Sequence, residues 1–482
     1  MTSDDKVNST ISAHKETSRI QKHRNFIQPE IIGIPGNIDV YDIAIQQLSD
    51  HCSLINKSHE AYLDFEDSTM KNASEMIFSK LALGRGEEVG KNQHPQKSNE
   101  TKELYTWEQI TEFATGSLVK CFGDHYSIYE GRRSPRTPNG DLQLISRVLE
   151  VNGTRGDFKN GGSLVSEYDV PADAWFYRQN SSPVMPYSIY MEIALQPCGF
   201  LATYMGCTLI YPDIELCFRN LDSTATMLKE VDLRNRTITA TSKLITVASS
   251  AETVIVRFDY ELILDGDTFF KGDTSFGYFT PRSLANQVGL DKGENAPPWY
   301  VKNDLAASTA INIDLKSQEA RNIYYTASPE KPFFKQAGGQ LDFLEKILIF
   351  EQGGDYGLGY VYSEKEIDPD DWFFPFHFFQ DPVMPGSLGV EAILQSLRLF
   401  ALQQNLGSGF KSPCFTNAVS QVTWNYRGQI IKTDKLMSIE AHIKNIEKLT
   451  DRIVITADAS LWKNGLRIYR VMDAAIAIVE MR

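Results

Sequence analysis

A single histidine, His377, stands in an aromatic run just before a proline- and glycine-rich turn, Pro382-Val-Met-Pro-Gly386. The segment after the turn is apolar and carries Glu391 and Gln395. Side chains four residues apart lie on one face of a helix, so these two would point the same way. A helix that starts at the turn leaves backbone N–H groups free to face a negatively charged ligand atom. A histidine, a carboxylate and free N–H groups are the parts of a proton-transfer site.

Most of this arrangement occurs twice in the chain. Residues 183–196 repeat the turn and the helix start of residues 382–395 at an offset of 199. The matching residues of the first copy are Pro183, Met185, Pro186, Ser188, Glu192, Leu195 and Gln196. Farther along, Asp265-Gly266 and Asn464-Gly465, both favoured hairpin turns, keep the same offset. A repeat of this length indicates a duplicated domain, and only the second copy has the histidine.

Composition and charge narrow the class of protein. Hydrophobic residues make up 42% and charged residues 23% of the 482 residues, as in ordinary globular proteins. The net charge of −14 argues against nucleic acid or an anionic membrane as a partner. The six cysteines are scattered, which predicts free thiols in a reducing compartment. The start of the chain lacks a secretory pattern, and no apolar run approaches the roughly 18–20 residues of a membrane span. We therefore expect a cytoplasmic protein.

Residue patterns divide the chain into three parts. Residues 1–30 and 84–104 are polar, and residues 52–82 have loose helical spacing, so 1–100 is predicted to be a disordered or helical linker. The two copies occupy 101–300 and 301–482. In the first copy we predict a helix at 107–121, a second helix from Ser188 that Pro197 kinks or ends, and strands near 142–151, 163–170, 208–219, 226–248, 252–264 and 267–279. In the second copy we predict a helix at 387–405 and strands near 341–351, 357–366, 415–431, 434–447, 451–462 and 466–480.

The order of these elements predicts the architecture. Each copy has one early helix and long strands with alternating apolar and polar residues, which is typical of antiparallel sheets. The 387–405 helix is apolar around most of its circumference and must be covered on all sides. A sheet curved around the helix does this. We predict an α+β fold of two antiparallel sheets, each wrapped around a central helix, as a pseudo-twofold pair.

The residues around His377 also resemble a known family. The pattern His377-Phe-x-x-x-Pro-x-Met-Pro-Gly-x-Leu-x-x-Glu391-Ala-x-x-Gln395 is very similar to the signature of bacterial 3-hydroxyacyl-acyl-carrier-protein dehydratases, which have the hot-dog fold. With 185–200 and 218–222, the duplication resembles the tandem dehydratase region of polyunsaturated fatty acid synthases and lipid polyketide synthases, over about residues 101–482. The resemblance implies a double hot-dog fold and no cofactor, with the substrate carried on the phosphopantetheine of a carrier protein.

The resemblance further implies partners and a reaction. We expect an acyl carrier protein and other synthase subunits or domains as partners, and leave a homodimer open. The implied reaction is dehydration of a (3R)-3-hydroxyacyl-carrier protein to the trans-2-enoyl product. The Asp-Pro-Val-Met-Pro-Gly run is typical of a branch that also isomerises the double bond, whereas Glu391 is typical of plain dehydratases. Isomerisation therefore stays open.

In the dehydratase family each site takes its histidine from one hot-dog unit and its carboxylate from the other. Carried onto this chain, His377 would face Glu192, while Glu391 and Gln395 would belong to a vestigial mirror site. That mirror site lies opposite residues 178–182, which contain no histidine. If the two copies are aligned at Pro183, Arg178 stands opposite His377. If they are aligned at Trp175 instead, the first copy must have a deletion of two residues. In either alignment we expect the mirror site to be inactive.

Dehydration requires a base at C2, an acid for the 3-hydroxyl group and stabilisation of the thioester oxygen. His377 is the expected base, because imidazole titrates near neutral pH and aromatic surroundings disfavour its charged form. Glu192 is the expected acid. The N–H of Gly386 is the expected oxyanion donor. We assign oxyanion or orienting roles to Phe376 and Gln196 as well.

Other functions compete with this hypothesis. A hot-dog thioesterase would hydrolyse acyl thioesters, a reaction that does not require the histidine opposite the carboxylate. A noncatalytic acyl-binding or docking module of a megasynthase would not need His377 at all. No His, Cys or Asp cluster in the sequence has metal-ligand spacing, so no metal is expected.

Overall fold

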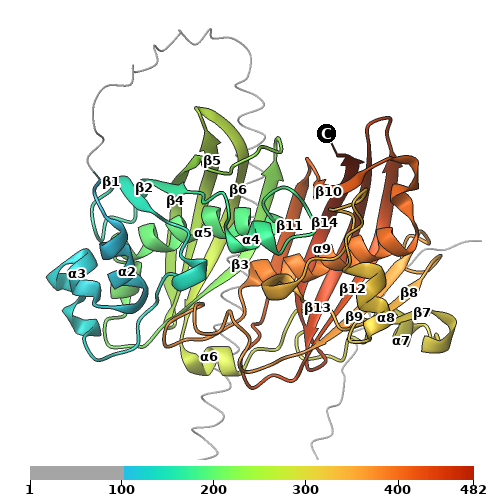
Figure 1. Cartoon of the computed structure of the whole chain (residues 1–482). Helices are drawn as coiled ribbons and strands as arrows, with labels where there is room; N and C mark the ends of the chain where they lie inside the picture. Colours follow the sequence, from blue (N-terminus) through green and yellow to red (C-terminus); the bar gives the residue numbers. More distant parts are fainter. Residues whose placement is uncertain (1–102, 482) are drawn as a thin grey trace, which may run out of the picture. The chain divides into compact units, whose positions relative to one another are not determined.

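The computed structural model describes residues 103–481, all within one compact unit, Lys91–Arg482. The predicted linker at 1–100 lies outside the described residues. The described strands form a single 14-stranded antiparallel sheet in the order β1-β2-β4-β5-β6-β3-β11-β14-β13-β12-β9-β8-β7, with β10 paired to β14 (Figure 1). Two long helices, α5 and α9, lie against this sheet, one for each half of the chain.

The first half contains the elements from α2 to β6. Its helices are α2 (Trp107–Thr115), α3 (Leu118–Phe122), α4 (Trp175–Arg178) and α5 (Tyr187–Tyr204), with 3₁₀ turns at Asp124–Tyr129, Gly140–Leu142 and Cys207–Ile210. Its strands are β1 (Arg147–Asn152), β2 (Gly162–Asp169), β3 (Cys217–Met227), β4 (Thr237–Ser250), β5 (Thr253–Leu264) and β6 (Asp267–Phe279).

The second half repeats this order after a connecting segment. The connection contains α6 (Pro281–Ala285), α7 (Trp299–Lys302), a 3₁₀ turn at Ala307–Thr309, β7 (Ile311–Asp314) and α8 (Gln318–Tyr324). The elements that follow are a 3₁₀ turn at Gly339–Leu341, β8 (Lys346–Phe350), β9 (Tyr360–Glu366), α9 (Gly386–Gln403), a 3₁₀ turn at Leu406–Gly409, β10 (Pro413–Asn417), β11 (Gln421–Tyr426), β12 (Leu436–Lys448), β13 (Arg452–Lys463) and β14 (Leu466–Glu480).

Each half is a sheet curved around one central helix, which is the hot-dog arrangement that the repeat predicts. Helix α5 packs against β2, β4, β5 and β6, and α9 packs against β9, β12, β13 and β14. Both helices are buried along most of their length because sheet and neighbouring helix cover them on several sides. The two helices also contact each other, so the halves share one hydrophobic core.

The two predicted sheets are joined into one at the β3–β11 pair. Thr224 of β3 pairs with Thr423 of β11, its own counterpart 199 residues later, and their hydroxyl oxygens lie 3.2 Å apart. The register is symmetric about this pair: Thr226 meets Gln421, and Asp222 meets Asn425. A local twofold axis therefore passes between the two threonines.

Several predicted boundaries are wrong. The helix expected at 107–121 is interrupted at Gly116. The expected strand at 208–219 begins as a 3₁₀ turn and becomes extended only from Cys217, and the expected strands at 226–248 and 415–431 are each divided by a loop. Pro197 neither ends nor divides α5, which runs on to Tyr204. Proline removes one backbone hydrogen bond, and the burial of the helix on both sides of Pro197 outweighs this local cost.

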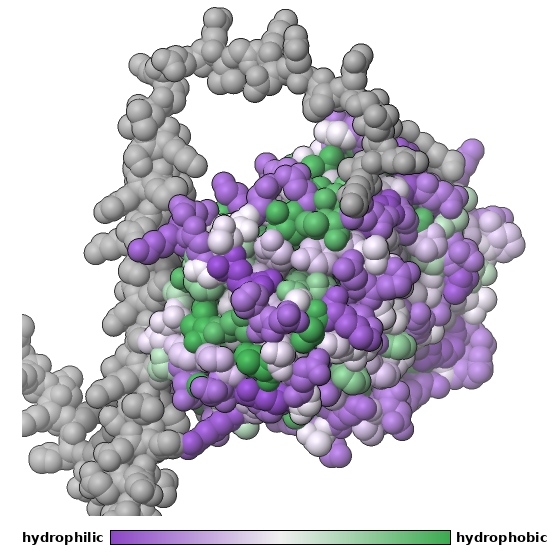
Figure 2. Space-filling model, turned by 90° about the vertical axis from the view of Figure 1, so that its left-hand side faces the viewer, coloured by the Kyte–Doolittle hydropathy of each residue, from purple (hydrophilic) through white to green (hydrophobic). Residues whose placement is uncertain are grey.

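The outer edge of the first half is partly covered. Leu104 and Tyr105 pair through their backbones with Val148 of β1, which satisfies hydrogen-bonding groups at this edge. The side of the molecule beyond this edge shows apolar residues interspersed among polar ones (Figure 2). Within residues 103–481, no helix has the length and apolarity needed to cross a membrane.

Candidate active site

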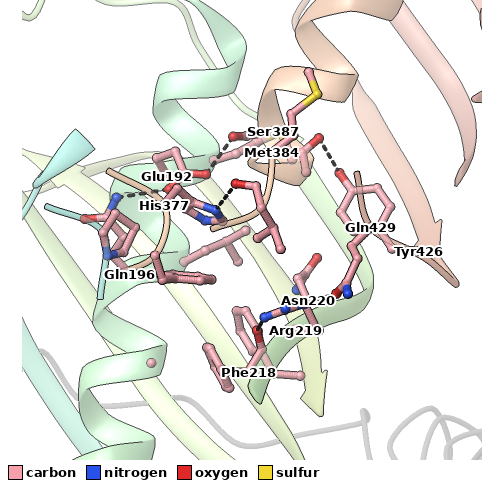
Figure 3. Close-up of a pocket in the computed structure, with 18 of the residues that line it drawn as sticks. Glu192, Gln196, Phe218, Arg219, Asn220, His377, Met384, Ser387, Tyr426 and Gln429 are labelled. Atoms are coloured by element: carbon pink, nitrogen blue, oxygen red, sulfur yellow. Dashed lines mark hydrogen bonds between the residues drawn. The ribbon is translucent and has the colours of Figure 1, made fainter. Parts of the chain in front are cut away.

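A pocket of about 90 Å³ opens between the two halves (Figure 3). The first half contributes one side of α5, the start of β3 and the segment before the 3₁₀ turn at Gly140–Leu142. The second half contributes the loop with His377, the start of α9 and the end of β11. Its polar lining residues are Arg136, Thr137, Glu192, Gln196, Arg219, Asn220, His377, Ser387, Tyr426, Gln429 and Tyr469. Its walls therefore combine groups that can transfer protons with apolar surface.

His377 lies on the loop between β9 and α9 and is only 8% exposed. Its Nδ1 lies 3.2 Å from the carbonyl oxygen of Val383, which selects the tautomer with hydrogen on Nδ1 and leaves Nε2 basic. Burial lowers the pKa of His377 below its ordinary value, although the nearby Glu192 and the Val383 carbonyl act in the opposite direction. The imidazole is therefore neutral near pH 7.

Glu192 lies on α5 and is 6% exposed. The hydroxyl group of Ser387, from the other half, donates to its Oε1 at 2.6 Å, and Gln196 donates to its Oε2 at 3.0 Å. Gln196 is itself fixed, because it donates to the Leu142 carbonyl oxygen at 2.8 Å and accepts from the Leu144 N–H at 3.0 Å. One residue from each half thus holds the carboxyl group in place.

Gly386 is the first residue of α9 and reaches the pocket wall at Tyr426. A Cβ atom at this position would lie 2.5 Å from a ring carbon of Tyr426, so only glycine allows this close approach. Tyr426 also donates a hydrogen bond to the Gly386 carbonyl oxygen at 3.1 Å. The first N–H groups of α9, which lack partners within the helix, are therefore held beside the pocket.

The structure brings four of the predicted residues together: His377, Glu192, Gln196 and Gly386 all line the pocket. Phe376 does not belong to the lining; its ring packs against Gly140, and its carbonyl oxygen accepts from the backbone of Asn139. Sequence reasoning gave no role to Ser387, Arg219, Asn220, Tyr426 or Gln429. The one available signal for Ser387 was that both copies have a serine four residues before the glutamate: Ser188 before Glu192 and Ser387 before Glu391.

The predicted mirror site keeps part of the same framework. Glu391 is fully buried, and Ser188 of the first half donates to its Oε2 at 3.3 Å. Gln395 donates to its Oε1 at 3.4 Å and to the Leu341 carbonyl oxygen at 2.6 Å. These contacts correspond, residue by residue at the offset of 199, to those around Glu192.

Backbone contacts show which residue of the first copy stands where His377 stands in the second. Asn139 donates to the carbonyl oxygen of Phe376, and Gly338, 199 residues after Asn139, donates to that of Gln179. Gln179 therefore corresponds to Phe376, and the next residue, Asn180, corresponds to His377. The side-chain amide of Asn180 donates to the Val184 carbonyl oxygen at 2.8 Å, as Nδ1 of His377 faces Val383.

The alignment from Trp175, with a two-residue deletion in the first copy, is thus correct. The alignment from Pro183, which places Arg178 opposite His377, is wrong. The side chain of Arg178 is 60% exposed and pairs with Asp173. Asn180 reproduces the hydrogen bond that holds the imidazole, but an amide has no basic nitrogen. The mirror site therefore lacks a base.

A second difference closes the mirror site. Gly199 of α5 lines the pocket, whereas its counterpart on α9 is Arg398. The Arg398 side chain is 3% exposed, and its Nη1 pairs with Glu391 at 2.5 Å. In the pocket the space beside Gly199 is open, whereas in the mirror site the Arg398 side chain fills the corresponding space. The same side chain neutralises the Glu391 carboxylate in an ion pair. Tyr187 likewise stands where Gly386 begins α9.

Comparisons with known proteins agree with the duplication. The family described as FabA-like domain matches residues 137–273 and 337–472. Over 387 residues the chain is 35% identical to one of the subunits of the polyunsaturated fatty acid synthase of Thraustochytrium sp. (strain ATCC 26185 / S-3), covering 78% of this chain and 26% of that protein. The chain thus spans about a quarter of that relative.

Solved structures that the chain matches have low sequence identity to it. The bifunctional dehydratase-cyclase domain in ambruticin biosynthesis is 12% identical, with a TM-score of 0.36 over 70% of this chain and 95% of that one. The dehydratase domain from the CurJ module of curacin polyketide synthase is 12% identical, with a TM-score of 0.36 over 70% and 97%. A putative oleoyl thioesterase from Lactobacillus plantarum is 8% identical, with a TM-score of 0.36 over 67% and 98%.

Proposed function

Because the chain belongs to the FabA-like domain family, we propose that it removes water from (3R)-3-hydroxyacyl chains held as thioesters on a carrier protein, giving trans-2-enoyl thioesters. One observation carries the proposal. His377 from the second copy and Glu192 from the first line a single pocket, as a base and an acid on a shared substrate would.

His377 acts as the base in this proposal. Its Nδ1–H points at the Val383 carbonyl oxygen, so the neutral ring can take the C2 proton on Nε2. The burial that lowers the pKa of His377 keeps this nitrogen free of a proton near neutral pH. As the C2–H bond breaks, negative charge develops on the thioester oxygen. In this proposal the N–H of Gly386, which begins α9 and lines the pocket, stabilises that charge.

Glu192, in its protonated form, gives its proton to the 3-hydroxyl group, which leaves as water when the C3–O bond breaks. The electron pair of the C2–H bond becomes the new C2–C3 double bond, so atoms and electrons balance. Ser387 and Gln196 hold the carboxyl group in position throughout. The cycle closes when the proton taken by His377 returns to Glu192.

The relative belongs to a polyunsaturated fatty acid synthase. We therefore propose that the substrates belong to polyunsaturated fatty acid or lipid polyketide synthesis. In this proposal the carrier protein and other synthase subunits or domains are its partners. No metal or redox group is needed for the proton transfers described above.

A mass-spectrometric assay on a 3-hydroxyacyl-carrier protein tests the reaction. We expect the wild-type chain to catalyse the loss of one water from the acyl group. His377→Ala and Glu192→Gln should each slow it strongly. Release of the free acid would indicate a thioesterase, and no turnover of any acyl chain would indicate a noncatalytic module. Unchanged turnover in His377→Ala would contradict the assignment of the base.

A further inference from the structure

The loop that carries His377 is longer than its counterpart. After the pair of equivalent residues His377 and Asn180, four residues (378–381) precede Pro382, whereas two residues (181–182) precede Pro183. The longer loop ends in Asp381, which is absent from the shorter one. The extra length therefore belongs to the half that holds the proposed base.

Asp381 is anchored to the other half of the molecule. The guanidinium group of Arg219, at the start of β3, binds both carboxylate oxygens, at 2.7 and 2.9 Å. Both side chains are largely buried, with exposed fractions of 9% and 15%. Arg133 reinforces the anchor, donating to the Gln380 carbonyl oxygen at 2.9 Å and lying 3.4 Å from Asp381. The bidentate geometry fixes direction as well as distance.

Arg219 lines the pocket, but most of its donors are already occupied. Besides Asp381, the guanidinium group donates to the Phe218 carbonyl oxygen at 2.7 Å and, from Nε, to the side chain of Gln429. Four of its five N–H bonds therefore have protein partners. This makes Arg219 a support for the pocket wall and the loop rather than a binding group for substrate. Its counterpart in the second copy is Ala418, so the mirror site has no such anchor.

We propose that Arg219, from the copy without the histidine, is a positioning residue that holds the loop of His377 through Asp381. The first copy then has two tasks in the active site: it supplies Glu192, and it anchors the base of the second copy. This inference rests on the proposed dehydration only for its kinetic readout.

The charges around His377 allow positioning to be separated from a charge effect: a charge effect alone would change kcat in opposite directions in variants of Arg219 and Asp381, whereas loss of the anchor lowers kcat in both. Glu192 faces the ring from α5, Arg219 from β3, and Asp381 from its own loop, while Arg133 and Arg136 lie on the segment packed against that loop. Burial sets the lowered pKa of His377; Arg219 lowers it further, and Asp381 raises it. Removing the charge of Arg219 or of Asp381 leaves the charge of the other residue uncompensated beside His377. The two single variants should therefore change the titration of His377 in opposite directions.

The experiment is a titration of histidine-labelled full-length chain by nuclear magnetic resonance, with the His377 signal assigned from the His377→Asn variant. We expect Arg219→Gln to move the His377 titration to higher pH and Asp381→Asn to move it to lower pH. The double variant, which removes both charges, should return it toward wild type. In the dehydration assay both single variants should lose kcat by about 10-fold to 100-fold with little change in KM, because misplacing a catalytic group by about 1 Å costs up to about 100-fold.

Asp169→Asn is the matched control. Asp169 on β2 binds Arg147 on β1 through two contacts, at 2.6 and 3.0 Å, at one end of the sheet. Neither residue lines the pocket, so the loss of this pair should alter neither the titration nor kcat. Shifts of the same sign in both single variants, or an unchanged titration with unchanged kcat, would overturn the inference. If wild type shows no dehydration but the opposite shifts appear, the proposed function fails, while the shifts support the placement of the Arg219–Asp381 pair against His377 from which the inference is argued. Thermal melts of each variant separate these effects from unfolding.

Discussion

The pocket at His377 and its mirror at Asn180 share one framework of hydrogen bonds and differ in the side chains around it. In both, a glutamate on one central helix accepts from a serine on the other helix and from a glutamine one turn along its own helix. The serine contacts cross between α5 and α9 around the local twofold axis. The framework is therefore part of how the two helices pack, and its presence alone does not make a site active.

The differences lie in the base and in the open space. Asn180 replaces His377 while keeping the hydrogen bond to the following valine carbonyl, and Arg398 replaces Gly199. The first change removes the proton acceptor, and the second fills the cavity. In the proposed mechanism the mirror site has thus lost its base while its structural contacts remain, because those contacts also stabilise the helix pair.

The most direct test of this comparison is to replace His377 by asparagine, the residue that stands at the corresponding position, 180, of the mirror site. His377→Asn should retain the contact to Val383, as Asn180 does to Val184, and therefore the fold. Without a base, kcat for dehydration should fall by about 10²–10⁴-fold, the usual contribution of a general base. Steady-state kinetics with a thermal melt of the same sample measures both. Retained activity would mean that proton removal does not depend on the imidazole.

The two glutamates should respond very differently to substitution. Glu192→Gln removes the proposed acid but can still bond to Ser387 and Gln196, and we expect a loss of kcat of about 100-fold or more. The matched change at the mirror site is the double variant Glu391→Gln/Arg398→Leu, which removes both members of its ion pair. It should keep nearly full activity in the same assay. Equal losses in the two proteins would contradict a single active site.

The ion pair that closes the mirror site should matter for stability. Arg398→Leu alone leaves Glu391 buried without its cation, and breaking a buried pair in this way costs about 3–5 kcal/mol of unfolding free energy. The double variant, which removes both charges, should recover most of this loss. Urea denaturation of the two proteins gives the comparison. If the single variant were as stable as wild type, the buried pair would not be holding Glu391.

Filling the active pocket should sharpen the comparison further. A Cβ at Gly199 would lie 3.2 Å from the ring of Phe218, and a leucine would add bulk where Arg398 stands in the mirror site. We expect Gly199→Leu to reduce kcat/KM more for long 3-hydroxyacyl chains than for short ones. A series of carrier-bound substrates of increasing length measures this, and an equal loss at every length would place Gly199 away from the acyl chain.

The smallest expected effect is on the pH dependence of stability. His377 has a lowered pKa in the folded chain, so the unfolded chain binds its proton at higher pH. Unfolding free energy should therefore fall as pH drops below the ordinary histidine pKa of about 6.5. Between neutral and mildly acidic pH, the His377→Asn variant should lose less unfolding free energy than the wild-type chain. Denaturation at several pH values measures this, and identical slopes in the two proteins would show that His377 titrates normally.

The sequence alone determined the architecture and predicted the principal residues of the candidate site. The offset of 199 revealed the duplication, and an all-round apolar helix required a sheet wrapped around it. The signature around His377 and the repeated Glu192 then indicated one shared site. These features are visible because helix faces, turns and duplicated motifs are local patterns that survive in the order of residues.

Tertiary structure decided which residues surround the site. It identified Asn180 rather than Arg178 as the counterpart of His377, placed Phe376 outside the pocket, joined the sheets at Thr224 and Thr423, and brought Arg219 to Asp381. It also showed that Arg398 fills the mirror site. Each of these facts depends on how one half packs against the other or on how a loop of changed length closes. Such contacts join residues far apart in the chain, and no local pattern encodes their geometry.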